Sequence, residues 1–109
     1  MEKSCSLSME LAAKIYMLLC IDEISLHGSS VVYINRDLVS LARITKEDYD
    51  FVEIIMQDLI NKGLVEEHRT GYFSIYKATI IPDGVNNLNL TVDELYLIAK
   101  NKIGDVYNS

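Results

Sequence analysis

The clearest periodic pattern of apolar and polar positions lies between residues 49 and 60. Apolar side chains recur there at intervals of three and four residues, at Tyr49, Val52, Ile55, Met56 and Leu59, with Ile60 at the edge of the stripe. This is the period of an α-helix that buries one face. Thr45 is a suitable N-cap for this helix, and Gly63 after Lys62 is a suitable stop. The pattern therefore predicts a helix with one buried stripe.

A β-hairpin is expected directly after this helix. The first strand begins at Leu64 and Val65, and residues 69–71 form a polar turn that ends in glycine. Residues 72–76 return as a second strand, because they are rich in aromatic and β-branched side chains. Residues 80–81 could extend the second strand until Pro82 ends it.

A shorter helix is expected before the periodic one. Asn35 is its predicted cap, and residues 36–42 form the helix, with Leu38, Leu41 and Ala42 facing inward. Residues 43–45 then make the turn into the long helix, which is the spacing of a helix-turn-helix unit. The composition of residues 31–34 predicts a short strand before this unit.

The N-terminal part of the chain predicts a long helix that is apolar on nearly all sides. It is expected from Ser8 to about Ile24, after a mobile tail over residues 1–7. A helix without a wide polar face must be covered on more than one side.

The C-terminal part predicts a last helix after a turn and connector over residues 82–90. Thr91 and Glu94 have the spacing of a capping box, and Gly104 is the expected stop after Ile103. The expected apolar stripe is Val92, Leu95, Tyr96, Ala99 and Ile103. A helix of about twelve residues is marginal alone in water, so we expect it to pack on the first helix. The two helices would form a homodimer interface; folding back within one subunit is the alternative.

The order of these elements predicts an α+β fold of the type helix, strand, helix, helix, strand, strand, with an extra C-terminal helix. From Leu11 to Lys77 the chain resembles winged-helix (winged helix-turn-helix) domains, through the stretches INRDLVSLARITKEDYDFVEIIMQDLINKGLVEE and HRTGYFSIYK. It is most similar in pattern to the N-terminal domains of phage replisome organisers and DnaD-like primosome proteins. The resemblance implies one winged-helix domain over residues 8–81 and a DNA-binding role in transcription regulation or replication.

The charge of the chain changes this picture. Its 109 residues carry a formal net charge of −6, from 10 Lys and Arg against 16 Asp and Glu. Such a chain repels phosphate at long range, so DNA binding requires its cations to gather on one face.

Two sets of residues are therefore candidates for a binding site. For nucleic acid we expect backbone contacts from Arg36, Arg43, Arg69 and Lys77, and base contacts from Lys46, Gln57 and Asn61. For a basic protein partner we expect the acidic face of the long helix, with an apolar anchor among carboxylates: Glu47, Asp50, Glu53, Ile54 and Asp58. A merely solvated helix face is the plain alternative.

The sequence carries no pattern that points to catalysis or to a cofactor. The five glycines are isolated, so no glycine-rich phosphate loop is present, and neither His27 nor His68 has an evident nucleophile partner. Cys5 and Cys20 form no C-x-x-C motif. The apolar run over residues 15–21 is too short to span a bilayer. We therefore expect a non-enzymatic cytoplasmic protein without a metal or cofactor.

Overall fold

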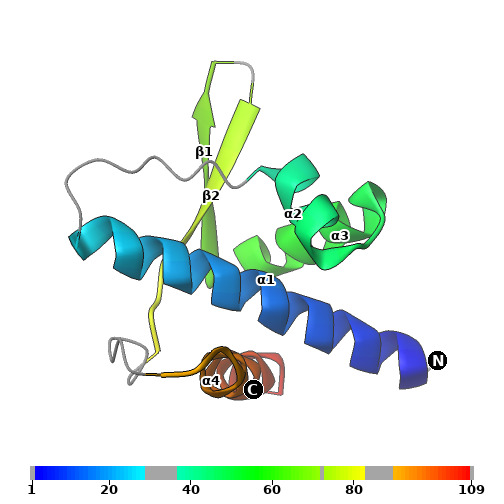
Figure 1. Cartoon of the computed structure of the whole chain (residues 1–109). Helices are drawn as coiled ribbons and strands as arrows, with labels where there is room; N and C mark the ends of the chain where they lie inside the picture. The colour runs from blue at the N-terminus through cyan, green and yellow to red at the C-terminus, as the bar shows by residue number, and fades with distance from the viewer. Residues whose placement is uncertain (1, 29–36, 72, 83–89, 109) are drawn as a thin grey trace.

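The computed structural model describes residues 2–28, 37–71, 73–82 and 90–108. The fold is α+β, and the described residues form four helices and one two-stranded antiparallel sheet (Figure 1). In chain order the elements are α1 (Glu2–Gly28), α2 (Leu38–Thr45), α3 (Tyr49–Asn61), β1 (Val65–Thr70), β2 (Phe73–Ala78) and α4 (Val92–Tyr107). The strand expected over residues 31–34 lies outside the described residues.

Helix α1 is the centre of the fold. Figure 1 shows it crossing the molecule, with the hairpin, α2 and α3 on one side and α4 on the other. Its buried side chains occupy slightly more than half of the helix circumference, and Lys14 on the remaining side is exposed. The buried residues are Leu11, Ala12, Ala13, Ile15, Tyr16, Leu19 and Cys20. The Tyr16 hydroxyl also donates a hydrogen bond to the backbone carbonyl of Ile80, after the hairpin. The expectation that this apolar helix is covered on more than one side is confirmed.

Helix α1 is longer than expected at both ends. It begins at Glu2, so residues 2–7 are helical and the expected tail is wrong. No glycine or proline interrupts the chain between Glu2 and Leu26, and an acidic residue in the first turn favours a helix. The helix therefore ends where the first glycine, Gly28, occurs.

Helix α2 begins two residues later and ends three residues later than the sequence predicts. Its N-cap is Asp37 rather than Asn35, because the Asp37 carboxylate accepts a hydrogen bond of 2.8 Å from the backbone N–H of Ser40. Thr45 belongs to its last turn and donates a hydrogen bond of 2.7 Å to the carbonyl of Leu41. Thr45 is therefore not the cap of α3.

The turn between α2 and α3 has three residues, 46–48, as expected in length but not in position. Lys46 adopts a left-handed conformation, with φ of 60°, and Asp48 occupies the N-cap position of α3 without a side-chain hydrogen bond. Consequently Lys46 and Glu47 lie before α3 rather than on it.

The buried stripe of α3 is as expected for Val52, Ile55, Met56 and Leu59, while Ile54 is 64% exposed. The expectation for Tyr49 is wrong, since its side chain is 44% exposed. Tyr49 lies at the first residue of the helix, where its ring extends beyond the core.

The hairpin follows the sequence pattern closely. Gly63 and Gly71 have φ of +80° and +66°, a backbone conformation that residues other than glycine rarely adopt. The strands pair from Val65 opposite Ala78 to Thr70 opposite Phe73. Residues 80–81 do not extend β2, because β1 begins at Val65 and the pairing ends with the hydrogen bond of 3.0 Å from the Thr79 amide to the Leu64 carbonyl, next to the turn at Gly63.

Helix α4 packs on α1 within the same chain, which is the fold-back that we expected as the alternative to helix pairing across a dimer. Its capping box is confirmed: the Glu94 amide donates to the Thr91 hydroxyl over 3.2 Å, and the Thr91 amide donates to the Glu94 carboxylate over 3.1 Å. Ala99 and Ile103 are buried as expected, but Val92 is 64% exposed.

Helix α4 also continues past its expected end. It runs through Gly104 to Tyr107, because apolar contacts continue beyond the glycine. Tyr107 packs against the core, and the ammonium of Lys62 lies 5.3 Å from the centre of its ring. The expected stop at Gly104 is therefore wrong.

Candidate binding cleft

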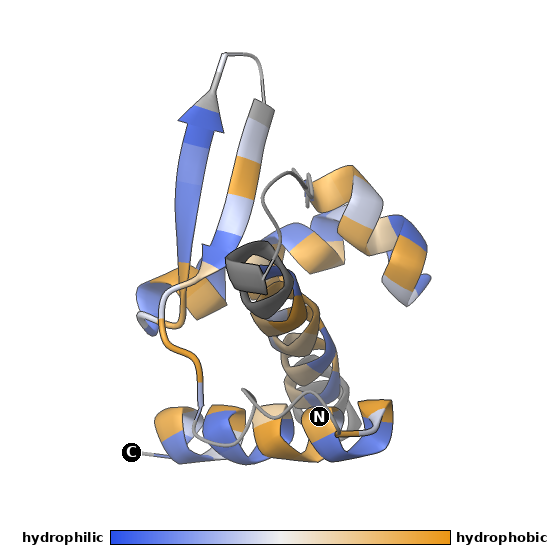
Figure 2. Ribbon diagram, turned by 60° about the vertical axis from the view of Figure 1, so that its left-hand side comes forward, coloured by the Kyte–Doolittle hydropathy of each residue, from blue (hydrophilic) through white to orange (hydrophobic). Residues whose placement is uncertain are grey.

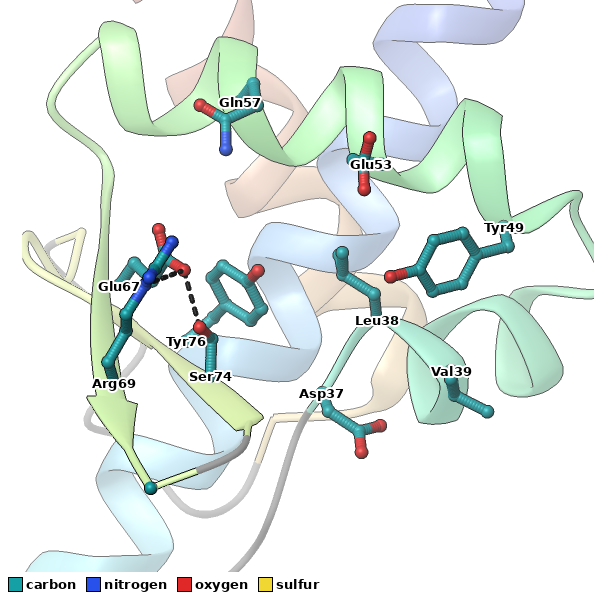
Figure 3. Close-up of a pocket in the computed structure, with 11 residues that line it drawn as sticks. Asp37, Leu38, Val39, Tyr49, Glu53, Gln57, Glu67, Arg69, Ser74 and Tyr76 are labelled. Carbon is teal, nitrogen blue, oxygen red and sulfur yellow. Dashed lines mark hydrogen bonds and ion pairs between the residues drawn. The ribbon is translucent and has the colours of Figure 1, made fainter.

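A cleft of about 760 Å³ lies between the hairpin and helices α2 and α3 (Figure 3). The start of α2, one face of α3 and the inner face of the hairpin line it. The lining residues are Asp37, Leu38, Val39, Tyr49, Glu53, Gln57, Glu67, Arg69, Gly71, Ser74 and Tyr76.

Local geometry explains why these side chains converge. Tyr49, Glu53 and Gln57 recur every fourth residue and so share one face of α3. Figure 3 shows Glu53 and Gln57 on the side of α3 that faces the hairpin. On β1, Glu67 and Arg69 are two residues apart and share one face of the strand. Their cross-strand neighbours, Tyr76 and Ser74, belong to the same face of the hairpin.

The charges of the cleft are mainly negative. Three carboxylates (Asp37, Glu53 and Glu67) face one cation, Arg69, so the formal net charge of the lining is −2. Glu67 accepts a hydrogen bond of 2.6 Å from the Ser74 hydroxyl, and the Arg69 Nε lies 3.8 Å from the same carboxylate oxygen. The Arg69 side chain is 85% exposed, which means that solvent weakens this ion pair. Figure 2 shows that β1, which carries both residues, is hydrophilic along most of its length.

Two tyrosines give the cleft an aromatic floor. Figure 3 shows the rings of Tyr49 and Tyr76 on either side of Leu38. The pKa of Tyr76 is raised, first by burial and then by nearby groups including Glu67 and Glu53, whereas Arg69 acts in the opposite direction. The phenol of Tyr76 therefore stays protonated at neutral pH beside the carboxylates.

The described candidates for nucleic-acid binding do not come together on one surface. Gln57 and Arg69 line the cleft, while Arg43, Lys46 and Asn61 are exposed elsewhere. Lys77 pairs in register with Glu66, on the opposite face of the hairpin from Arg69. On that outer face His68 Nε2 also lies 2.9 Å from Glu66 Oε1. Arg36 lies outside the described residues.

The candidates for a basic protein partner are also divided. Glu53 lines the cleft, whereas Glu47, Asp50 and Ile54 are exposed outside it. Asp58 is half-buried beside Tyr107, and burial, followed by the Asp58 carboxylate, raises the pKa of that tyrosine. Asp50, Glu53, Ile54 and Asp58 still share one side of α3 by the helical period, but Glu47 lies before the helix and only Glu53 of the five lines the cleft.

Several lining residues are absent from both sets of candidates. Glu67 and Tyr76 could have been found from the alternation of the two strands, which places them with Arg69 on one face. The apolar period of the helix assigns Tyr49 to the core, so its i,i+4 relation to Glu53 is not recognised from the sequence. Asp37, Leu38 and Val39 reach the cleft through the tertiary fold, for which the local sequence gives no signal.

The described residues show neither a metal site nor a membrane-spanning helix. There, no group of three or more His, Cys, Asp and Glu side chains could hold a metal ion. Among the helices as described, none has the length and apolar character needed to cross a membrane. None of the family models, curated proteins or solved structures with which the chain was compared matches it.

Proposed function

We propose that the protein is a non-enzymatic binding module of the winged-helix type, and that its cleft binds a basic segment of a partner protein. The order of α1, α2, α3 and the hairpin supports this assignment, as does the three-residue turn between α2 and α3. In this proposal α3 and the hairpin occupy the positions of the recognition helix and the wing.

The observation that carries the proposed function is the excess of carboxylates around an apolar floor. A lysine or arginine side chain has an aliphatic stem and a charged end. Its stem can pack on Leu38 and Val39, while its charge lies near Glu53 and Glu67 and over a tyrosine ring. The cleft thus offers partners for both parts of a basic side chain.

DNA binding in the same place, the function implied by the resemblance, has weaker support. A phosphate backbone between α3 and the hairpin would meet Glu53 and Glu67, and the nearby cation Arg69 is already beside Glu67. Lys77 faces away from this cleft. A basic protein segment matches the sign of the charges in the cleft, and DNA does not.

Fluorescence anisotropy can test the proposal with two labelled probes, an arginine- and lysine-rich peptide and a DNA duplex of random sequence. We expect the peptide to bind and the duplex to leave the anisotropy unchanged at low salt. Glu53→Gln should weaken peptide binding up to about five-fold, which corresponds to the loss of one exposed charge pair of about 1 kcal/mol. Asp105→Asn is the matched control, because it removes an exposed carboxylate of α4 outside the cleft.

Two results would count against the proposal. If Asp105→Asn weakened peptide binding as much as Glu53→Gln, the binding would reflect net charge rather than the cleft. If the duplex bound and Arg69→Ala lowered its salt slope by about one unit, the wing would be contacting a phosphate. The second result would restore the DNA-binding interpretation.

A further inference from the structure

A second hollow of about 580 Å³, which shares no residue with the cleft, lies where α1, the end of α2 and the start of α4 meet. We call it the α1–α4 groove. Its lining residues are Glu10, Lys14, Met17, Leu18, Ile44, Thr45, Val92, Asp93, Tyr96 and Lys100.

Large apolar side chains are exposed at the edges of this groove. Ile44, in the last turn of α2, is 46% exposed, and Val92, the first residue of α4, is 64% exposed. Between them Met17, Leu18 and Tyr96 are half-buried. Exposed apolar side chains gathered around a hollow are typical of an interaction surface.

The charged residues of the groove are balanced, unlike those of the rest of the protein. Glu10 and Asp93 are matched by Lys14 and Lys100, so the formal net charge of the lining is zero. The whole chain carries −6, and the lining of the cleft carries −2. Two copies of such an acidic chain repel each other at long range, but the lining of this groove adds no net charge to that repulsion.

We infer that the α1–α4 groove binds a second copy of the chain, with the same groove on both subunits. In a two-fold interface each surface patch meets itself, so an attractive patch must carry charges of both signs. The groove carries two of each sign around an apolar floor. Contact between the rims of the two grooves would bury the exposed Ile44 and Val92 of each copy and allow carboxylates of one copy to face lysines of the other.

This arrangement differs from the homodimer that the sequence suggests. That dimer pairs the last helix with the first helix across a two-fold axis, whereas here α4 packs on α1 of its own chain. The inferred interface instead uses the edge that remains between α1 and α4, and it requires no exchange of helices.

A charge-swap experiment tests self-association without knowledge of which residues pair. One variant has an acidic groove, Lys14→Glu with Lys100→Glu, and the other has a basic groove, Glu10→Lys with Asp93→Lys. Sedimentation equilibrium should show the wild type as a dimer in the micromolar range. Each variant alone should stay at 12.4 kDa, and their equimolar mixture should regain a species of twice that mass.

Two single substitutions at exposed sites provide a second test of the same interface. Val92→Asp should abolish the dimer, whereas Ile54→Asp should leave it intact, since both residues are 64% exposed and Ile54 lies outside the groove. Circular dichroism verifies that each variant is folded. If the charge variants do not fold, this single-substitution pair decides the question.

Three outcomes would overturn the inference. The wild type could sediment as a single 12.4 kDa species at all concentrations. The two folded charge variants could remain monomers when mixed. Val92→Asp could dimerise as strongly as the wild type. In the last two cases any dimer of the wild type would use a different surface.

Discussion

Truncation of Leu59 tests the core that holds α3 against α1. Leu59 is fully buried, at 0% exposure, in the middle of the stripe formed with Val52, Ile55 and Met56. Leu59→Ala removes three carbon atoms from this packed site and leaves a cavity that its neighbours fill only partly. Substitutions of this kind reduce the free energy of unfolding by about 2–5 kcal/mol.

Ile54 is the matched control on the same helix. It is 64% exposed, so only about a third of its side chain is removed from water by folding. Complete burial of such a side chain is worth about 1.5–3 kcal/mol, and we therefore expect Ile54→Ala to cost less than about 1 kcal/mol.

Urea unfolding followed by circular dichroism measures both changes. With an m-value of about 1.5 kcal/mol/M, Leu59→Ala should lower the midpoint by roughly 1–3 M and Ile54→Ala by less than about 0.7 M. Equal shifts of the two midpoints would refute the orientation of α3. If Leu59→Ala does not fold, Leu59→Val still distinguishes the two positions, because it creates a smaller cavity.

Three further predictions concern the termini of the helices and the buried ionisable groups. Gly63→Ala should lower the free energy of unfolding by about 1–2 kcal/mol in urea titration. The cost comes from the backbone, since Gly63 has φ of +80° and no atom lies near the added methyl. An equal cost for Gly104→Ala, within α4, would exclude this explanation. Thr91→Ala should cost about 0.5–2 kcal/mol and Thr91→Ser much less, because serine preserves the hydroxyl of the capping box; equal losses would mean that the methyl group matters instead. Burial raises the pKa of the Cys20 thiol to about 12, although its hydrogen bond with Tyr16 acts in the opposite direction. In a Cys5→Ser background iodoacetamide should therefore label Cys20 slowly at pH 8 and rapidly in urea. Since the folded state holds this proton more tightly than the unfolded state, the associated stability is present below about pH 8.5 and is lost as the pH rises toward 12. Cys20→Ser should remove this loss; if the unfolding free energy depends on pH in the same way with and without Cys20, the prediction is wrong.

The parts of the fold that the sequence predicts well depend on local chemistry. Gly63 and Gly71 mark turns because their backbone conformations exclude most other residues. The capping box at Thr91 needs only two side chains three residues apart. The stripe of α3 repeats often enough that its period identifies the buried face. For the turns and the capping box, residues close in sequence supply the whole interaction. For α3 they supply the pattern that marks the buried face.

The boundaries of α2 show where local chemistry is ambiguous. Asn35 and Asp37 are both good N-cap residues, and Thr45 can cap the following helix or bond back to Leu41 within the preceding one. The structure uses Asp37 and the backward bond. A fully buried Leu41 is consistent with this choice, since its position against the core determines where the short helix lies.

The cleft was the least predictable feature, because four segments separated in sequence build it. A helical wheel groups Glu53 with Ile54 and Asp58, but the hairpin folds over only one edge of that face. Tyr49 matches the apolar period and yet belongs to the cleft rather than to the core. Which polar face of a helix becomes a site thus depends on the element that packs next to it.

Helix α2 relates the two proposed surfaces to each other. Its N-terminal residues Leu38 and Val39 line the cleft, and its C-terminal residues Ile44 and Thr45 line the α1–α4 groove. Between them Leu41 is fully buried against the core, so α2 is held as one piece. A second copy bound in the groove would therefore use none of the residues that line the cleft. It would also contact the helix that forms one wall of that cleft, and dimerisation could stabilise the cleft.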